Sequence, residues 1–193
     1  LYYNAIRRNG STFVVSNGAQ TDMALQAMQK NRNRSLVDAF REPYRIAGNK
    51  PGEWIDLTTY EPDAPNWTPR ITAVMAPDWM ATIIVKENRG ERDMEPFTQL
   101  PAIPGIGYLV CTYSGQNVEK GVRIPSWTGP PVKCEIKGAE PKEVAERVYA
   151  ALGPKSGPGI LQPDADFRVG VAVVFYDIKG NSSKTYCMNR LDK

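Results

Sequence analysis

The sequence predicts an α+β fold built mainly from antiparallel strands. Segments rich in β-branched and aromatic residues outnumber the helical patterns, and the helices fall into two separate groups along the chain. The last two strand segments are separated by Lys179-Gly180-Asn181, a connection short enough to require antiparallel neighbours. With 193 residues, 41% of them apolar, we expect a single domain over residues 1–193 with a sizeable core.

The N-terminal residues predict a helix end followed by a strand. Residues 1–8 (LYYNAIRR) fit the last two turns of a helix, because Asn9-Gly10 is a common C-terminal stop. Residues 11–17 (STFVVSN) then fit a strand.

Two helix starts follow this strand. Thr21 or Asp22 is suited to cap a helix that runs to Lys30. Ser35 followed by Asp38 is a capping signature and predicts a short helix that ends at residue 40.

The remainder of the chain predicts a long loop, five strands and one helix. Residues 43–67 are polar and rich in Pro, Gly and Asn, which predicts an uncovered loop. Residues 141–152 predict an amphipathic helix, with a proline in the first turn and Gly153 after the last. The predicted strands are residues 70–76, 80–87, 106–113, 167–178 and 183–189.

The composition excludes several kinds of chemistry. Histidine is absent, so imidazole bases, Ser-His-Asp triads and histidine-based metal sites are impossible, and proton transfer must use carboxylates, tyrosines, lysines, cysteines or water. The three cysteines, Cys111, Cys134 and Cys187, are too widely spaced for a zinc site or a disulfide framework. We therefore expect neither a metal nor a redox cofactor.

Charge and hydropathy limit the partners and the location. The net charge of +3 comes from 24 basic and 21 acidic residues that are mixed along the chain, which argues against a nucleic-acid partner but leaves a small anionic ligand open. Neither an apolar span nor a secretory signal pattern is present, so we expect a cytoplasmic protein and no membrane partner.

Three polar segments are candidates for binding or catalysis. Residues 16–22 (SNGAQTD) lead from a strand into a helix N-terminus, where free backbone N–H groups favour an anion, although an ordinary turn and N-cap would look the same. Residues 111–117 (CTYSGQN) end a strand and offer Tyr113 as a stacking surface or a plain sheet-end aromatic.

The third segment, residues 58–71 (TTYEPDAPNWTPRI), has the most unusual composition. Its three prolines stiffen the backbone without regular secondary structure. Glu61 and Asp63 lie two residues apart in an extended stretch, so their side chains tend towards one face and one of them could serve as a base. Arg70 offers a planar fork to a phosphate or carboxylate, although a solvated Arg-carboxylate pair would also fit.

Taken in this order, the three segments resemble the archaeal-type IMP cyclohydrolase family, including its bacterial IMP cyclohydrolase-like members. The resemblance covers most of the chain, and the YEPDAPN-x-TPRI string carries most of its specificity. The matching residues are Tyr3-Asn4-Ala5-Ile6, Ser16-Asn17-Gly18, Gln20-Thr21-Asp22, Tyr60-Glu61-Pro62-Asp63-Ala64-Pro65-Asn66, Thr68-Pro69-Arg70-Ile71 and, more weakly, Gly107-Tyr108 with Thr112-Tyr113.

The resemblance implies ring closure of 5-formamidoimidazole-4-carboxamide ribonucleotide to IMP with loss of water, the last step of de novo purine biosynthesis. It implies a metal-independent enzyme, a homo-oligomer, and a four-layer αββα sandwich of two stacked antiparallel sheets, similar to the N-terminal-nucleophile hydrolases. The resemblance also implies strands upstream of Tyr3, with a basic pocket residue, and we expect this chain to lack them.

The resemblance also assigns roles. Glu61 would transfer protons, while Tyr3 and Tyr60 would donate to the formyl oxygen. Arg70 would bind phosphate or brace the acids, and Asp63 could clamp Arg70. The implied substrate-binding residues are Asn17, Asp22, Asp63, Asn66, Arg70 and Tyr113, and we expect the three segments to converge on one cleft at the ends of the stacked sheets.

Two other functions remain open. One is a purine-nucleotide-binding protein that keeps the scaffold without efficient cyclisation. The other is an amide hydrolase of the related fold, which Leu1 argues against because it has no nucleophilic side chain, unless upstream processing exposes a Cys, Ser or Thr.

Overall fold

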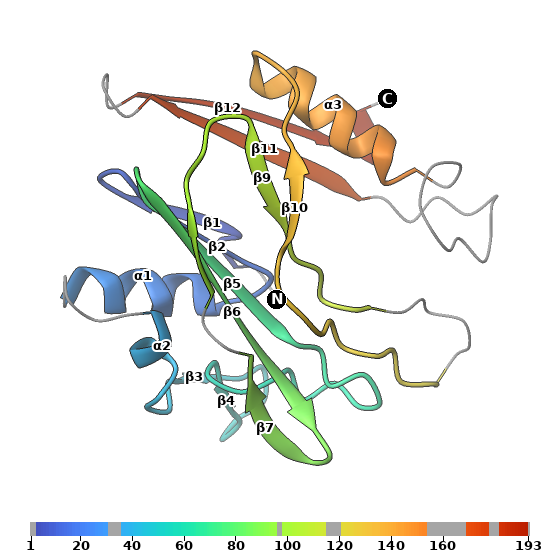
Figure 1. Ribbon diagram of the computed structural model, residues 1–193. Helices are drawn as coiled ribbons and strands as arrows, with labels where there is room; N and C mark the ends of the chain where they lie inside the picture. The colour runs from blue at the N-terminus through green and yellow to red at the C-terminus, as the bar shows by residue number, and fades with distance from the viewer. Residues whose placement is uncertain are drawn as a thin grey trace. The chain divides into compact units, whose positions relative to one another are not determined.

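A computed structural model describes residues 3–30, 36–95, 98–114, 121–153, 169–177 and 182–192 (Figure 1). The chain forms two compact units, Leu1–Ile103 with Tyr108–Lys133, and Pro104–Gly107 with Cys134–Lys193. The division passes through β9 (Ile106–Leu109) and β10 (Val132–Glu135), which pair as a two-stranded ribbon. The strands outnumber the helices, in agreement with the predicted α+β class.

A six-stranded antiparallel sheet forms the centre of the first unit. Its order is β1-β2-β5-β6-β7, and β8 pairs with the same edge of β6 as β7 does, but nearer the start of β6. The strands are β1 (Ile6–Asn9), β2 (Thr12–Ser16), β5 (Arg70–Met75), β6 (Trp79–Asn88), β7 (Glu91–Met94) and β8 (Thr98–Pro101).

The predicted helix at residues 1–8 is wrong. Ile6–Asn9 is a strand, and it pairs with β2 from Ile6 opposite Val15 to Asn9 opposite Thr12. Asn9 is the last residue of β1, and Gly10, with φ +58°, begins the two-residue turn of the hairpin, so Asn-Gly leads into a hairpin here and does not end a helix. Asn-Gly serves both purposes, and here strand pairing decides between them.

Two helices, α1 (Gln20–Lys30) and α2 (Leu36–Ala39), pack on one face of this sheet (Figure 1). The predicted caps Thr21 and Asp22 lie inside the first turn of α1, because the helix begins at Gln20, two or three residues earlier than these caps imply. The predicted cap of α2, at residue 35, lies outside the described residues.

The core lies between these helices and the sheet. Side chains alternate along a strand, so Arg70, Thr72 and Val74 of β5 all point towards the helices. Thr72 and Val74 are at most 1% exposed, and Arg70 is equally buried at the end of the same row. The core cluster comprises Val14, Met23, Ala24, Leu25, Leu36, Phe40, Leu57, Val74, Ile83 and Val85.

The predicted long loop at residues 43–67 contains a hairpin of two short strands, β3 (Arg45–Ala47) and β4 (Trp54–Asp56). Ile46 and Ile55 face each other across the pair and pack against the core. Strands of three residues, separated by a Gly- and Pro-containing turn, carry too little alternation to be recognised in the sequence.

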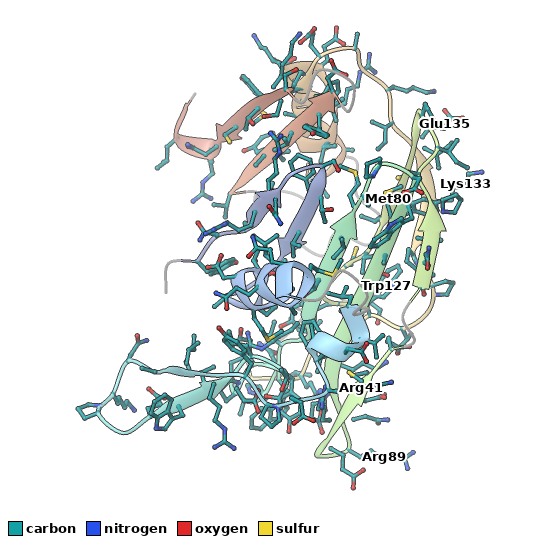
Figure 2. The ribbon with its side chains drawn as sticks, turned by 90° about the vertical axis from the view of Figure 1, so that its left-hand side faces the viewer. Arg41, Met80, Arg89, Trp127, Lys133 and Glu135 are labelled. Atoms are coloured by element: carbon teal, nitrogen blue, oxygen red, sulfur yellow. The ribbon has the colours of Figure 1, made fainter. Side chains whose placement is uncertain are left out.

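The strands β7, β8 and β10 were not predicted, and β9 is shorter than the predicted 106–113. The β6–β7 connection is a two-residue turn, in which Arg89 and Gly90 have φ +54° and +88°. Two positive φ angles are typical of a type I′ hairpin. Figure 2 shows Arg89 at the tip of this hairpin.

The second unit contains a helix and a hairpin. Helix α3 (Pro141–Ala151) contacts β11 (Gly170–Asp177) and β12 (Ser182–Asn189). The two strands pair from Gly170 opposite Asn189 to Asp177 opposite Ser182, as predicted, although the turn between them lies outside the described residues. A 3-10 helix, Arg190–Asp192, follows. Among the described helices, none is long and apolar enough to cross a membrane.

Candidate active site

The segment from Glu61 to Thr68 is a loop closed by its own hydrogen bonds. The Glu61 N–H donates to the Thr68 carbonyl at 2.9 Å and joins the two ends. The Asp63 carboxylate accepts hydrogen bonds from the Thr68 N–H at 2.7 Å and from the Thr68 hydroxyl at 2.5 Å. Asp63 therefore holds the loop closed. The Asp63 carboxylate accepts its hydrogen bonds from Thr68, and its negative charge also favours the charged form of the Arg70 guanidinium.

Arg70 follows this loop as the first residue of β5, and its side chain is 1% exposed. Nε donates to the Thr59 carbonyl at 2.6 Å, and Nη1 contacts both the Glu61 carboxylate and, at 3.3 Å, Oε1 of Gln20. Nη2 is buried without a hydrogen-bond partner among the described residues. Burial lowers the pKa of the Arg70 guanidinium, and the charge of Glu61 opposes this effect.

Glu61 differs from Arg70 in its access to solvent, because 32% of its side chain is exposed. One carboxylate oxygen accepts from the buried guanidinium. An ion pair between a buried cation and a half-buried carboxylate fixes the carboxylate in place while leaving it reachable. The Arg70 guanidinium that holds Glu61 is buried, so a ligand cannot contact it.

The Asn17 side chain joins the strand-to-helix turn to the start of β5. Its Oδ1 accepts from the Ile71 N–H at 2.9 Å and from Nε2 of Gln20 at 3.0 Å, and its Nδ2 donates to the Pro69 carbonyl at 2.8 Å. An amide oxygen has two lone pairs, so Oδ1 is fully used, and one N–H of Nδ2 remains for other partners.

Tyr113 brings the third predicted segment to the same loop. Its hydroxyl lies 2.6 Å from the Thr68 hydroxyl, which also bonds Asp63. Tyr113 forms an isolated antiparallel bridge with Ser126. The remainder of this segment, residues 115–117, lies outside the described part of the chain.

These bonds place the three predicted segments side by side. Asn17 and Glu61 are linked through Gln20 and Arg70, and Tyr113 is linked to the loop through Thr68. Side chains separated by about fifty positions in the chain therefore meet around the first residue of β5.

The other predicted residues have different surroundings. The Tyr60 ring meets Trp67 edge-on, with centroids 5.7 Å apart. Asp22 pairs with Arg7 at 3.1 Å and accepts from the Asn4 amide at 3.1 Å, which ties α1 to β1 and to the segment before it. Tyr3 is 44% exposed on the segment that leads into β1. Asn66 is half-buried in the loop, and its N–H donates to the Asp63 carbonyl.

The pattern of the family of IMP cyclohydrolase-like proteins matches residues 1–156. The chain belongs to this family. The match includes every predicted site residue and α3, whereas β11 and β12 follow it. No curated protein matches the chain.

Two further residues join the hydrogen-bond network of this IMP cyclohydrolase-like protein and were not among the predicted site residues, although they lie within the quoted motifs. Gln20 is fully buried and contacts both Asn17 and Arg70. Thr68 connects Asp63 to Tyr113. Both residues lie inside the family motif, which could have identified them, but an amide and a hydroxyl did not by themselves indicate a role in catalysis or binding.

A cavity of about 250 Å³ lies on the opposite face of β6 from the core. Its wall includes Trp127, labelled in Figure 2, and Glu95, which forms an ion pair with the buried Lys86. The full lining is Thr82, Ile84, Glu95, Thr98, Val110, Trp127, Gly129, Pro130 and Pro131, and it includes none of the predicted site residues.

Proposed function

We propose that the protein closes the pyrimidine ring of 5-formamidoimidazole-4-carboxamide ribonucleotide to form IMP and water. The observation that carries the proposal is the partly exposed Glu61 carboxylate, held by a buried guanidinium in the loop that bears the most specific family motif. Such a carboxylate is both positioned and reachable, as a proton-transfer group must be.

The reaction needs little beyond positioning and proton transfer. The carboxamide nitrogen attacks the formyl carbon of the same molecule, so the two reacting groups are already tethered. The carboxamide nitrogen loses one proton and the formamido nitrogen loses a second, and the formyl oxygen gains both. The carbon–oxygen bond breaks as the formamido nitrogen forms a double bond to the same carbon, which releases water. Glu61 takes the proton from the carboxamide nitrogen and returns it to the departing oxygen.

Tyrosine hydroxyls would stabilise the charge that develops on the formyl oxygen. Tyr60 adjoins Glu61 in the chain, and its ring is braced by Trp67. Tyr3 would be the second donor. Asn66 and the remaining N–H of Asn17 would orient the carboxamide, and Asp22 and Tyr113 would complete the binding surface.

The burial of Arg70 favours one of its two predicted roles. A guanidinium that is 1% exposed braces the Glu61 carboxylate and is closed off from a phosphate. Its Nε and Nη1 are already engaged by Thr59, Gln20 and Glu61. We therefore assign Arg70 to positioning, and substrate phosphate would be held by other groups.

A binding protein on the same scaffold is the second candidate function. This function is favoured because Asn17 and Arg70 form most of their hydrogen bonds with other groups of the protein, which leaves few of their donors and acceptors for a substrate. A site of this kind could hold a purine ribonucleotide without promoting ring closure.

Family membership further supports a homo-oligomer, and a four-layer αββα sandwich as the architecture of the complete domain. Both remain proposals.

Glu61→Gln tests the function. The amide keeps the size of the side chain but cannot accept a proton, so kcat for ring closure should fall about 100- to 10,000-fold, while the affinity for IMP changes far less. Ring closure is followed by chromatographic separation of substrate and product. Glu42→Gln, at an exposed position, is the matched control and should behave as wild type.

Near-normal turnover by Glu61→Gln would show that this carboxylate is structural. A wild-type protein that binds the formamido nucleotide tightly, yet never closes the ring, would establish the binding function instead.

A further inference from the structure

Gln20 is a fully buried polar side chain at the first position of α1. Its Nε2 donates to Asn17 Oδ1 at 3.0 Å and to the Ile71 carbonyl at 3.4 Å, and its Oε1 accepts from Arg70 Nη1 at 3.3 Å. We propose that Gln20 is a positioning residue, which sets the orientation of the Arg70 guanidinium and, through it, the place of the Glu61 carboxylate. This inference rests on the proposed function.

The geometry of Arg70 explains why a second acceptor matters. Nε is held by the Thr59 carbonyl, whereas Nη1 is shared between Gln20 and Glu61 and Nη2 has no partner in the described structure. A guanidinium is planar and rigid, so fixing two of its nitrogens fixes the plane. Without Gln20, the Nη edge of Arg70 would be held by Glu61, the residue that Arg70 has to position.

Gln20 is suited to this task because its other end is anchored on the backbone. The Ile71 carbonyl belongs to β5, and Asn17 is itself bonded to the Pro69 carbonyl and the Ile71 N–H. The amide of Gln20 therefore transmits the position of the β5 backbone to Arg70. Both polar atoms of the Gln20 amide have partners, and a buried side chain that is satisfied in this way is held rigidly.

Gly18 protects this contact. A Cβ at Gly18 would lie 2.4 Å from Gln20 Oε1 and 3.2 Å from Arg70 Nη1. The φ angle of Gly18 is not in the left-handed region, so alanine meets no backbone penalty there. The added methyl group would instead displace the end of the Gln20 side chain from Arg70.

Two substitutions test the inference independently. Gln20→Met keeps the length of the side chain but removes both polar atoms, and Gly18→Ala displaces the intact Gln20 amide. Each should lower kcat for ring closure about 10- to 100-fold, since a misplacement of about 1 Å can cost about 100-fold. Gln29→Met, at an exposed position of the same helix, is the matched control and should leave kcat unchanged.

The decisive measurement repeats both substitutions in Glu61→Gln. If Gln20 acts through Glu61, either change should lower the residual kcat by less than about 3-fold, because residues that act as a unit are not additive. An equal loss of kcat in both backgrounds would refute the inference, as would unchanged kcat in the single variants. Failure of the proposed function is a separate result, because wild type would then show no turnover.

Discussion

Replacing Arg70 by methionine should destabilise the protein substantially, because the Arg70 guanidinium is buried at the start of β5. The substitution removes a hydrogen bond to the Thr59 carbonyl, one to Gln20 and the ion pair with Glu61. Hydrogen bonds to charged groups contribute about 1.5–3 kcal/mol each. The gross loss is therefore about 5–9 kcal/mol.

Two effects reduce this loss. Replacement of Arg70 by methionine removes the free-energy penalty of burying a guanidinium, which amounts to several kcal/mol. Glu61 is 32% exposed, so its charge regains water once Arg70 is gone. Removal of one partner from a fully buried ion pair costs about 3–5 kcal/mol, and partial exposure places the present case at about 2–4 kcal/mol.

Urea denaturation at pH 7 measures the effect. The four tryptophans, Trp54, Trp67, Trp79 and Trp127, all lie in the first unit, so their fluorescence follows the unfolding of the part that contains Arg70. The free energy of unfolding is taken from the midpoint at constant slope.

Arg41→Met is the matched control for this experiment. Arg41 pairs with Asp38 at 3.0 Å, but 67% of its side chain is exposed. Removal of such a pair should cost no more than about 0.5 kcal/mol. If Arg70→Met costs less than about 1 kcal/mol, or no more than Arg41→Met, the reasoning about the buried guanidinium is wrong.

Two further predictions concern acid stability and metals. Burial by itself would raise the pKa of Asp56, but hydrogen bonds from the Thr58 hydroxyl, the Thr58 N–H and the Tyr44 N–H, with the charge of Arg45, lower it below the ordinary 3.8. The ionised Asp56 carboxylate therefore stabilises the fold above the pKa of unfolded Asp56, and this stabilisation is lost as the pH falls through the pKa of folded Asp56. The loss of unfolding free energy caused by Asp56→Asn should shrink below about pH 4. If that loss stays constant from about pH 7 to about pH 3, the prediction is contradicted. Exhaustive chelation should leave ring closure unchanged, because the chain has no histidine and the reaction is an intramolecular condensation. Activity that is lost on chelation and restored by a divalent ion would disprove this mechanism.

The elements with a strong local pattern were predictable. The strands β2, β5, β6, β11 and β12 carry β-branched and aromatic residues, α3 has helical periodicity, and each element lies within a few residues of its predicted range. The helix predicted at the N-terminus failed because Asn9-Gly10 ends helices and turns hairpins alike. The partner strand β2, which the local pattern does not contain, decides between the two.

The sequence by itself determined which chemistry is available and where its motifs lie. The absence of histidine excludes imidazole catalysis, and the YEPDAPN-x-TPRI string places the candidate groups in one stiff loop. The tertiary structure alone decided what each group can do. The sequence left open whether Arg70 binds an anion or pairs with a carboxylate; strand alternation turns it towards the helices, where Gln20, fifty positions away in the chain, contacts it. Burial and partner choice depend on contacts between distant segments, and no local pattern of residues encodes them.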